Sequence, residues 1–250
     1  MPPGDRILSM NAYLGAGPIV AALEAGADIV ITGRCVDSAL TLAACMHHFG
    51  WAADAYDQLA AGSLAGHLLE CGPQSTGGNY TDWQSAGDLA EVGYPIVEMQ
   101  DSGAMTVTKP EGTQGIVSVA AVCEQMLYEI GDPQSYLLPD VVCDFSEVSL
   151  VQAGPDRVVV QGALGRAPTG MVKVSVTWMD GFRAGYLFQF NGVDARRKAR
   201  TFAQIGLDRA RNRLGQLGAA DYDEVCIETF GGRPGDGPYE EISLKAAVRH

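Results

Sequence analysis

Positive charge, aromatic side chains and long apolar runs are all scarce in this sequence. Lys and Arg supply 17 of the 250 residues against 30 Asp and Glu, so the net charge is −13 at pH 7. A surface with this excess of negative charge repels phosphate backbones, which argues against nucleic-acid binding. No apolar stretch reaches the roughly 18 uninterrupted residues of a membrane-spanning helix, so no membrane association is expected.

The sequence also lacks the patterns of a secreted protein or of a protein stabilised by a bound metal. No CxxC pair occurs, and the amino terminus has no charged-then-apolar signal pattern. Free, buried thiols in a reducing compartment are therefore expected, without a disulfide, and a cytoplasmic location follows. The six scattered cysteines are Cys35, Cys45, Cys71, Cys123, Cys143 and Cys226.

Several catalytic signatures are missing as well. The sequence contains no GxSxG elbow, no GxGxxG after a strand and no Walker loop. It is nevertheless 47% hydrophobic and 19% charged, which is typical of a globular protein. A chain of this length can bury a core without help from a metal or a disulfide.

The amino-terminal part alternates between helical and strand patterns. An apolar run at 27–32 follows a helical segment and is typical of a buried parallel strand. Gly33-Arg34 ends this run, and Asp37 or Ser38 can cap the next helix. This alternation predicts an α/β layer. The expected helices cover 18–26, 38–49, 55–71 and 116–130, and the expected short strands cover 95–99 and 104–108.

The carboxy-terminal part is rich in β-type residues and turn signals. Four segments, which we interpret as two hairpins, precede a long helix over 194–217. The fold class predicted is α/β: a layered αβα part over 1–145 joined to an antiparallel sheet with a long packed helix over 146–250, or one continuous domain. The four segments are 147–152, 157–163, 171–179 and 183–190, and further strands are expected near 223–230 and 240–248.

The end of the expected strand at 27–32 is the strongest candidate binding site. Ligands of α/β proteins gather where strands end and helices begin. Gly33 lets the backbone come close to a ligand, and the guanidinium of Arg34 offers a planar set of hydrogen-bond donors for a phosphate or carboxylate. In the structural alternative, Arg34 pairs with Asp37 and braces the turn.

A second candidate anion site is the loop from Lys109 to Gly115, which contains Thr113. Backbone N–H groups at a helix start, with a lysine nearby, favour anions. In the alternative, these residues form a loop without a binding role.

The segment Gly66-His67-Leu68-Leu69-Glu70-Cys71 carries the candidate catalytic groups. Helical spacing places His67, Glu70 and Cys71 close together, where imidazole and carboxylate can transfer a proton. A structural histidine is the alternative. No metal is predicted, because ligands from one helix need partners elsewhere. Gly77, Gly78 and Asn79 follow in a turn that could admit a ligand or simply connect two elements.

The helix at 194–217 carries seven of the seventeen basic residues of the chain. Its apolar positions follow helical spacing, which predicts a packed helix with a solvated basic face. An acidic partner subunit or the phosphates of coenzyme A are alternative ligands of that face.

Several segments in this order resemble the acyclic terpene utilisation protein A family. They are NAYLGAGPI at 11–19, GADIVITGR at 26–34, DSAL at 37–40, GHLLECG at 66–72, TGG at 76–78 and EQMLYEI at 124–130 with Asp132-Pro133. Family members have an α/β segment before Asn-Ala-Tyr, and many have a ferredoxin-like domain afterwards. This chain is therefore expected to be a central fragment. Gly131 stands where the family leads us to expect histidine, and Cys35-Val36 replaces Val-Ala.

The resemblance implies a bacterial protein of branched, terpenoid acyl-CoA catabolism, encoded beside a geranyl-CoA carboxylase. We expect an enzyme, with a lyase-type step on a 3-hydroxy-glutaryl-CoA-like substrate as the natural reaction. Asn11, Tyr13 and Asn79 would orient the substrate. No cofactor is expected, although a coenzyme A thioester fits as substrate.

The alternative is a non-catalytic partner of the carboxylase that docks through the basic helix. A homo-oligomer is compatible with either hypothesis. The run EAGADIVITGR also resembles the phosphate grip of some (β/α)₈ enzymes.

Overall fold

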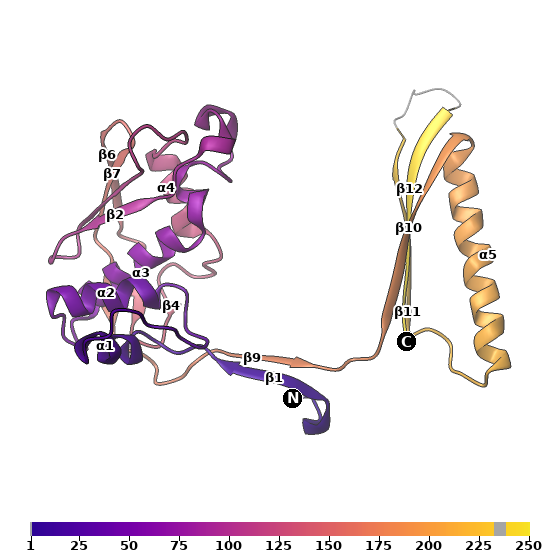
Figure 1. Ribbon diagram of the computed structural model, residues 1–250, viewed down its shortest axis with the longest axis horizontal. Helices are drawn as coiled ribbons and strands as arrows, with labels where there is room; N and C mark the ends of the chain where they lie inside the picture. The colour runs from indigo at the N-terminus through magenta and orange to yellow at the C-terminus, as the bar shows by residue number, and fades with distance from the viewer. Residues whose placement is uncertain (1, 233–238) are drawn as a thin grey trace. The chain divides into compact units, whose positions relative to one another are not determined.

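The computed structural model describes residues 2–232 and 239–250, and the chain forms two compact units (Figure 1). The N-terminal unit comprises Ser9–Val176, and the C-terminal unit comprises Met1–Leu8 together with Thr177–His250. These units are defined by internal contacts, so the division into domains at residue 145 stays a prediction. Both helices and strands are well represented, which confirms the α/β class.

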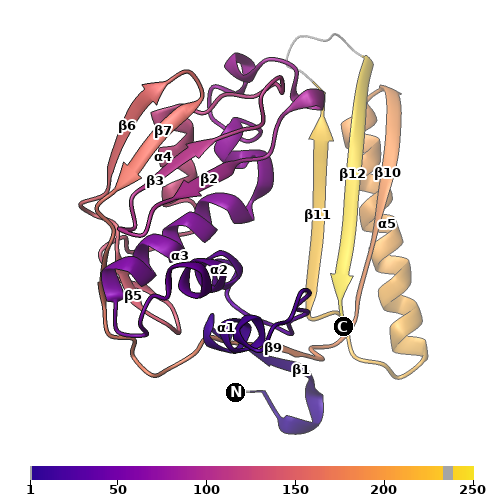
Figure 2. The same ribbon diagram turned by 60° about the vertical axis from the view of Figure 1, so that its left-hand side comes forward.

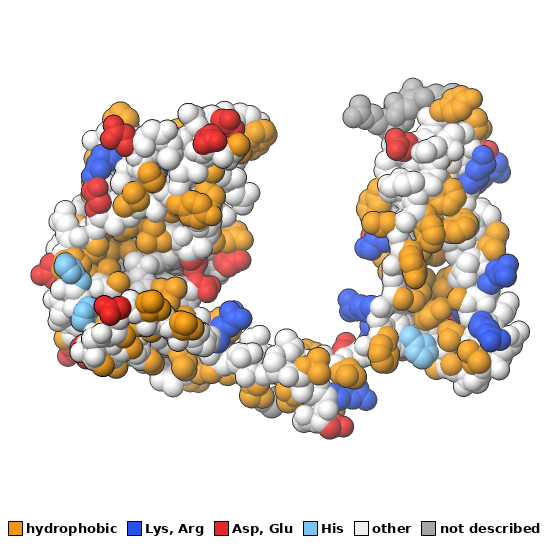
Figure 3. Space-filling model, viewed as in Figure 1, with side chains coloured by type: hydrophobic (Ala, Val, Ile, Leu, Met, Phe, Trp, Pro, Cys, Tyr) orange, Lys and Arg blue, Asp and Glu red, His pale blue; other side chains and the backbone are white. Residues whose placement is uncertain are grey.

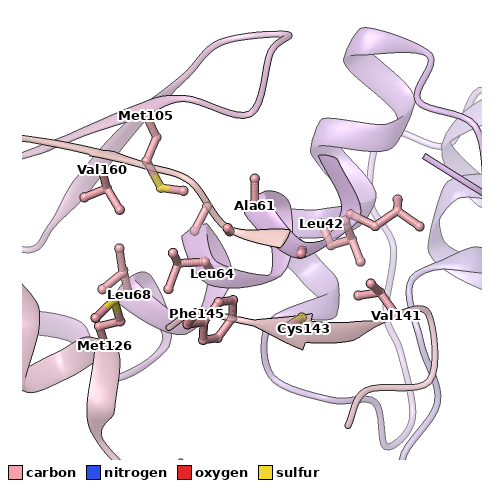
Figure 4. Close-up of a cluster of buried hydrophobic side chains, with 14 of the residues drawn as sticks. Leu42, Ala61, Leu64, Leu68, Met105, Met126, Val141, Cys143, Phe145 and Val160 are labelled. Carbon is pink, nitrogen blue, oxygen red and sulfur yellow. The ribbon is translucent and has the colours of Figure 1, made fainter. Parts of the chain in front are cut away.

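One helix, α3 (Tyr56–Glu70), is the centre of the N-terminal unit. Every residue from Leu59 to Leu68 is buried. Small residues allow this close packing: a Cβ added at Gly66 would lie 2.6 Å from the Cα of Ser38, just before α2 (Ala39–Phe49). The predicted helices at 38–49 and 55–71 are therefore confirmed. Figure 4 shows Leu64 and Leu68 of α3 within the core, near Met105 and Val160 from the strands.

Two antiparallel sheets and two further helices surround α3. The larger sheet has the strand order β2-β3-β7-β6, and the smaller one β4-β5-β8. Helix α4 is shorter than the predicted 116–130, because the Ser118 hydroxyl caps it by accepting a hydrogen bond from the Ala121 N–H at 3.1 Å. The bounds are α1 Gly17–Glu24, α4 Val119–Leu127, β2 Ile96–Met99, β3 Met105–Thr108, β4 Tyr136–Leu137, β5 Val142–Asp144, β6 Ser149–Gly154, β7 Arg157–Gln161 and β8 Leu164–Arg166.

The predicted buried strand at 27–32 is wrong. This segment has no strand hydrogen bonding, and Ile29 and Ile31 are 82% and 92% exposed. The nearest pairing is an isolated parallel bridge between Leu14 and Cys35. An apolar run becomes a buried strand only where neighbouring strands satisfy its backbone, and no described strand pairs with 27–32.

The predicted hairpin of 171–179 with 183–190 is also wrong, whereas β6 and β7 do form a hairpin. Strand β9 (Val174–Trp178) pairs with β1 (Ile7–Ala12), and β10 (Arg183–Val193) pairs along its whole length with β12 (Tyr239–Arg249). In this longer ladder Phe188 lies opposite Leu244. Such apolar pairs across strands stabilise a pairing between distant segments, which a local turn signal does not predict.

The C-terminal unit is the predicted antiparallel sheet with a long helix. Its strands have the order β10-β12-β11, with β11 at Glu224–Gly231. Helix α5 (Ala195–Gln216) runs along this sheet (Figure 2) and buries Ala195, Ala199 and Ala203. The four-residue spacing places these alanines on one face of the helix, against Ile242 and Leu244.

The chain also contains short 3₁₀ turns, at Gly4–Arg6, Gly72–Thr76, Trp83–Ala86 and Leu89–Glu91.

Glycine in the interior of α5 is the least expected choice in this helix. Gly206 costs roughly 0.8–1 kcal/mol relative to alanine at such a position. A Cβ added there would meet no atom within 4 Å, so close packing does not demand the glycine.

Among the described residues, no helix combines the length and apolar character needed to cross a bilayer.

Candidate functional site

Four of the predicted site residues line one cavity of the N-terminal unit. Tyr13, Asp37, His67 and Glu70 surround a volume of about 460 Å³, here called the His67 cavity. This volume lies within the usual range of small-molecule sites. The remaining lining residues are Val36, Glu129, Tyr136, Leu137, Leu138, Pro139, Thr169, Met171, Val172 and Lys173.

His67 and Glu70 form a hydrogen-bonded pair on the last turn of α3. Nδ1 of His67 lies 2.8 Å from Oε1 of Glu70, and their side chains are 3% and 16% exposed. Their spacing of three residues puts both on one face of the helix. Because a carboxylate only accepts, Nδ1 carries the proton in this bond, and the lone pair of the neutral ring lies on Nε2.

The two ring nitrogens of His67 have different environments. Nε2 is buried and has no hydrogen-bond partner among the described residues. The main-chain oxygen of His67 accepts a hydrogen bond from Nε2 of Gln125 at 2.8 Å, which fixes α3 against α4. A buried imidazole with one nitrogen held by a carboxylate and the other unpaired is the arrangement of a general base.

Tyr136 adds a hydrogen-bond donor to the His67 cavity. Its ring centroid lies 6.1 Å from that of His67. Burial, helped by the negative charge of Glu70, raises the pKa of Tyr136 to about 12. The phenol therefore stays protonated at neutral pH and can donate to an oxygen of a ligand.

The charges around the His67 cavity are unevenly distributed. Three carboxylates, Asp37, Glu70 and Glu129, line it together with one cation, Lys173. The ring of Tyr13 has the Lys173 ammonium and the Arg34 guanidinium each 5.1 Å from its centroid. An anionic group of a ligand would therefore be favoured beside Tyr13.

One side of the His67 cavity is apolar. The loop at β4 supplies Leu137, Leu138 and Pro139, and the segment before β9 supplies Met171 and Val172. These side chains suit an aliphatic group, since removing apolar surface from water is favourable.

Gly33 and Arg34 line a neighbouring cavity of about 340 Å³ rather than the His67 cavity. Arg34 lies over Tyr13, and within the described residues no ion pair joins it to Asp37. The Arg34–Asp37 pair that would brace the turn is therefore absent from the described residues. Arg34 contacts the ring of Tyr13, and Tyr13 in turn lines the His67 cavity.

Asn11 and the turn at 77–79 lie apart from the lining of the His67 cavity. Asn11 is exposed in β1. Nδ2 of Asn79 donates to Oε1 of Gln74 at 3.4 Å. Gly77 has a φ of 96°, and a Cβ there would lie 2.9 Å from that of Ala86, while Gly78 packs against Pro73. Close packing accounts for both glycines.

Lys109 and Thr113 are engaged within their own loop. Nζ of Lys109 donates to the main-chain oxygen of Thr113 at 2.6 Å and lies 3.2 Å from Oδ2 of Asp156. Oγ1 of Thr113 donates to the Pro110 oxygen at 2.7 Å. The Lys109 side chain is 8% exposed, so its charge is largely satisfied inside the protein.

Sequence reasoning missed Glu129, Tyr136 and Lys173. Glu129 has a φ of 60°, which is uncommon for a residue with a side chain. No local motif marks Tyr136 or Lys173, because tertiary packing brings their segments to α3. No group of three or more His, Cys, Asp or Glu able to hold one metal ion occurs in the part of the chain that the structure describes. All six cysteines are free.

The cavity therefore combines a buried, hydrogen-bonded imidazole–carboxylate pair with an apolar wall. The family model described as acyclic terpene utilisation family protein AtuA matches residues 2–249. The chain therefore belongs to the acyclic terpene utilisation family, and membership implies involvement in the use of acyclic terpenes. No curated protein and no solved structure matches the chain.

Proposed function

We propose that the chain is an enzyme of terpenoid acyl-CoA breakdown that carries out a lyase-type step on a 3-hydroxy-glutaryl-CoA-like substrate. The observation that supports this proposal is the buried His67–Glu70 pair, whose Nε2 has no partner within the described residues. A carbon–carbon cleavage that starts from a hydroxyl group needs a base of this kind.

The proposed reaction begins at the tertiary 3-hydroxyl group of the substrate. Nε2 of His67 takes the hydroxyl proton, and the C2–C3 bond breaks as the oxygen forms a ketone. The bonding electrons go to C2 and give the enolate of the shorter acyl-CoA. C2 then takes a proton from the imidazolium, which restores the base. Glu70 stabilises the imidazolium while it carries the proton.

The other residues of the His67 cavity would orient the substrate. The apolar wall at Leu137–Pro139 and Met171–Val172 receives the branched aliphatic group. Lys173 and Arg34, which both lie beside the Tyr13 ring, favour the free carboxylate or a coenzyme A phosphate. Tyr136 donates a hydrogen bond to an oxygen of the substrate.

Turnover of a 3-hydroxy-3-alkylglutaryl-CoA, followed by chromatography of the acyl-CoA and keto acid products, tests this function. His67→Gln should lower kcat by about 10²–10⁴-fold, the usual contribution of a general base. His47→Gln is the matched control, because His47 is exposed at the end of α2 and should leave turnover unchanged. Equal activity of the His67 variant, or no cleavage by the folded wild type with and without divalent metal, would reject the proposal.

The alternative function, a non-catalytic partner of a geranyl-CoA carboxylase, rests on helix α5. Lys198, Arg200 and Arg209 have no ion-pair partner among the described residues, so their charges are available to an acidic surface. Co-purification with the carboxylase subunits, lost on changing these three residues to Glu and accompanied by no acyl-CoA cleavage, would favour this alternative.

A further inference from the structure

A second cavity, within the C-terminal unit, lies between α5 and its sheet. It has a volume of about 390 Å³ and is here called the α5 groove. Its lining contains no charged side chain and includes both small residues, such as Gly206, Ala210 and Ala246, and the aromatic Phe188 and Phe202. Figure 3 shows hydrophobic side chains gathered along this unit. The groove therefore has the size and lining of a site for a small apolar ligand.

The groove exists because the two halves of α5 meet the sheet differently. The first half buries Ala195 and Ala199 completely against the strands. Further along the helix, Gly206 lines the groove, and a Cβ added there would meet no atom within 4 Å. Glycine in a helix interior is unfavourable, and packing does not require it here. The missing side chain instead keeps the groove open.

Apolar side chains along the groove remain in contact with water. Phe202 is 46% exposed although its ring contacts Phe188 at a centroid distance of 5.0 Å. Val225 and Ile227 of β11 are 37% and 36% exposed. Covering this surface would be favourable, and the lining offers almost no partners for the amides of a peptide, whose unpaired burial is costly. A hydrocarbon chain is the better match.

A free cation accompanies this apolar surface. Arg209 lies one helical turn from Gly206, so the two residues are neighbours on α5. Arg209 has no ion pair or hydrogen bond among the described residues, whereas Arg211 is paired with Asp221 at 3.0 Å. An apolar groove beside this cation suits a ligand with a hydrocarbon chain and an anionic head.

We propose that the α5 groove binds the branched chain of an acyclic terpenoid carboxylate, with its carboxylate at Arg209. Branched methyl groups need the width that Gly206, Ala210 and Ala246 leave, and membership of the acyclic terpene utilisation family supplies the class of ligand. This site is separate from the His67 cavity and does not depend on the reaction proposed there.

The test is calorimetric titration of the full chain with geranic acid, and with geraniol as the uncharged analogue. Gly206→Leu fills the groove and should weaken binding of both ligands at least tenfold. Its melting temperature should equal or exceed that of the wild type, because leucine favours helix and meets free space. Asn212→Leu, at an exposed position of the same helix, should leave binding unchanged. Arg209→Gln should weaken binding of geranic acid only.

Three results would overturn the proposal. The first is absence of binding by the wild type at millimolar ligand, and the second is unchanged affinity in Gly206→Leu. The third is loss of binding in His67→Gln, which would place the ligand in the His67 cavity. Retained binding by a catalytically inactive His67 variant supports the groove. Failure of the reaction and failure of the groove are therefore distinguishable.

Discussion

Nδ1 of His67 lies 2.8 Å from Oε1 of Glu70, while Nε2 of the same ring is buried without a partner in the described chain. The two nitrogens thus have opposite environments within one side chain. The carboxylate fixes which nitrogen holds the proton, and the buried position keeps competing water away from the other. This relationship connects the fold of α3 with the proposed role of His67 as a base, and it can be tested without knowledge of the substrate.

Glu70→Gln should change the tautomer of His67. The amide of glutamine can donate to Nδ1, which the carboxylate cannot, so the proton is expected to shift toward Nε2. Nitrogen-15 NMR of labelled histidine reports the tautomer directly. Glu91→Gln, at an exposed site in a 3₁₀ turn, is the control. An unchanged spectrum in Glu70→Gln would show that Glu70 does not orient the ring.

Lys109→Met should destabilise the protein without affecting ligand binding in the His67 cavity. The change removes the donor to the Thr113 oxygen and the cation beside Asp156, at a side chain that is 8% exposed. We expect a loss of about 1–3 kcal/mol, the usual cost of leaving a buried polar group without its partner. Urea unfolding measures it, with exposed Lys198→Met as control. Unchanged stability together with weaker anion binding would instead support an anion site at 109–115.

The sequence predicts local elements of this fold better than their pairing. Apolar periodicity and end residues define the helices near 38–49, 55–71 and 194–217, because these signals depend on neighbours in the chain. The pairing of β10 with β12 depends on contacts across the intervening α5 and β11, which no turn signal encodes. The exposed run at 27–32 fails for the same reason: its apolar character does not specify a partner.

The candidate site divides in the same way. His67 and Glu70 are recognisable because both chemical groups lie on one helical turn. Tyr136 and Lys173 reach the same cavity from segments far along the chain, so only the tertiary structure reveals them. Conversely, local signals alone predict an anion site at 109–115, whereas Asp156, the ion-pair partner of Lys109, lies far along the chain and is found only in the tertiary structure.

Alkaline pH should destabilise the protein through groups buried in their neutral forms. Burial raises the pKa of the Cys143 thiol, and that of the Tyr136 phenol, to about 12 each, from ordinary values of 9.0 and 10.0. The folded state therefore holds these protons after the unfolded chain has lost them. The stability they contribute is complete below about pH 9 and is lost as pH rises toward 12.

Urea unfolding at a series of pH values measures this loss. Cys143→Ala should give a shallower fall in unfolding free energy between pH 9 and 12 than the wild type, whatever its stability at pH 7. Cys35→Ala, at a half-buried position, should keep the wild-type slope. If the Cys143 variant and the wild type had equal slopes, the thiol would not be the group responsible.

Arg34→Lys should weaken ligand binding while leaving the fold largely intact. The guanidinium of Arg34 lies 5.1 Å from the centroid of the Tyr13 ring, which lines the His67 cavity. Lysine keeps the charge but cannot reproduce the planar, two-pronged hydrogen bonding of arginine to a carboxylate or phosphate. Affinity for a 3-hydroxy-glutaryl-CoA-like thioester, or for the free dicarboxylate, should fall by about 1.5–3 kcal/mol.

Arg34→Ala separates binding from stability. Arg34 is exposed, so its contact with Tyr13 should contribute no more than about 0.5–1 kcal/mol to folding. Calorimetry of binding and urea unfolding, measured on both Arg34 variants with Arg183→Lys as control, decide the question. A clear loss of stability with unchanged affinity for both ligands would remove Arg34 from the site and leave Lys173 as the cation beside Tyr13.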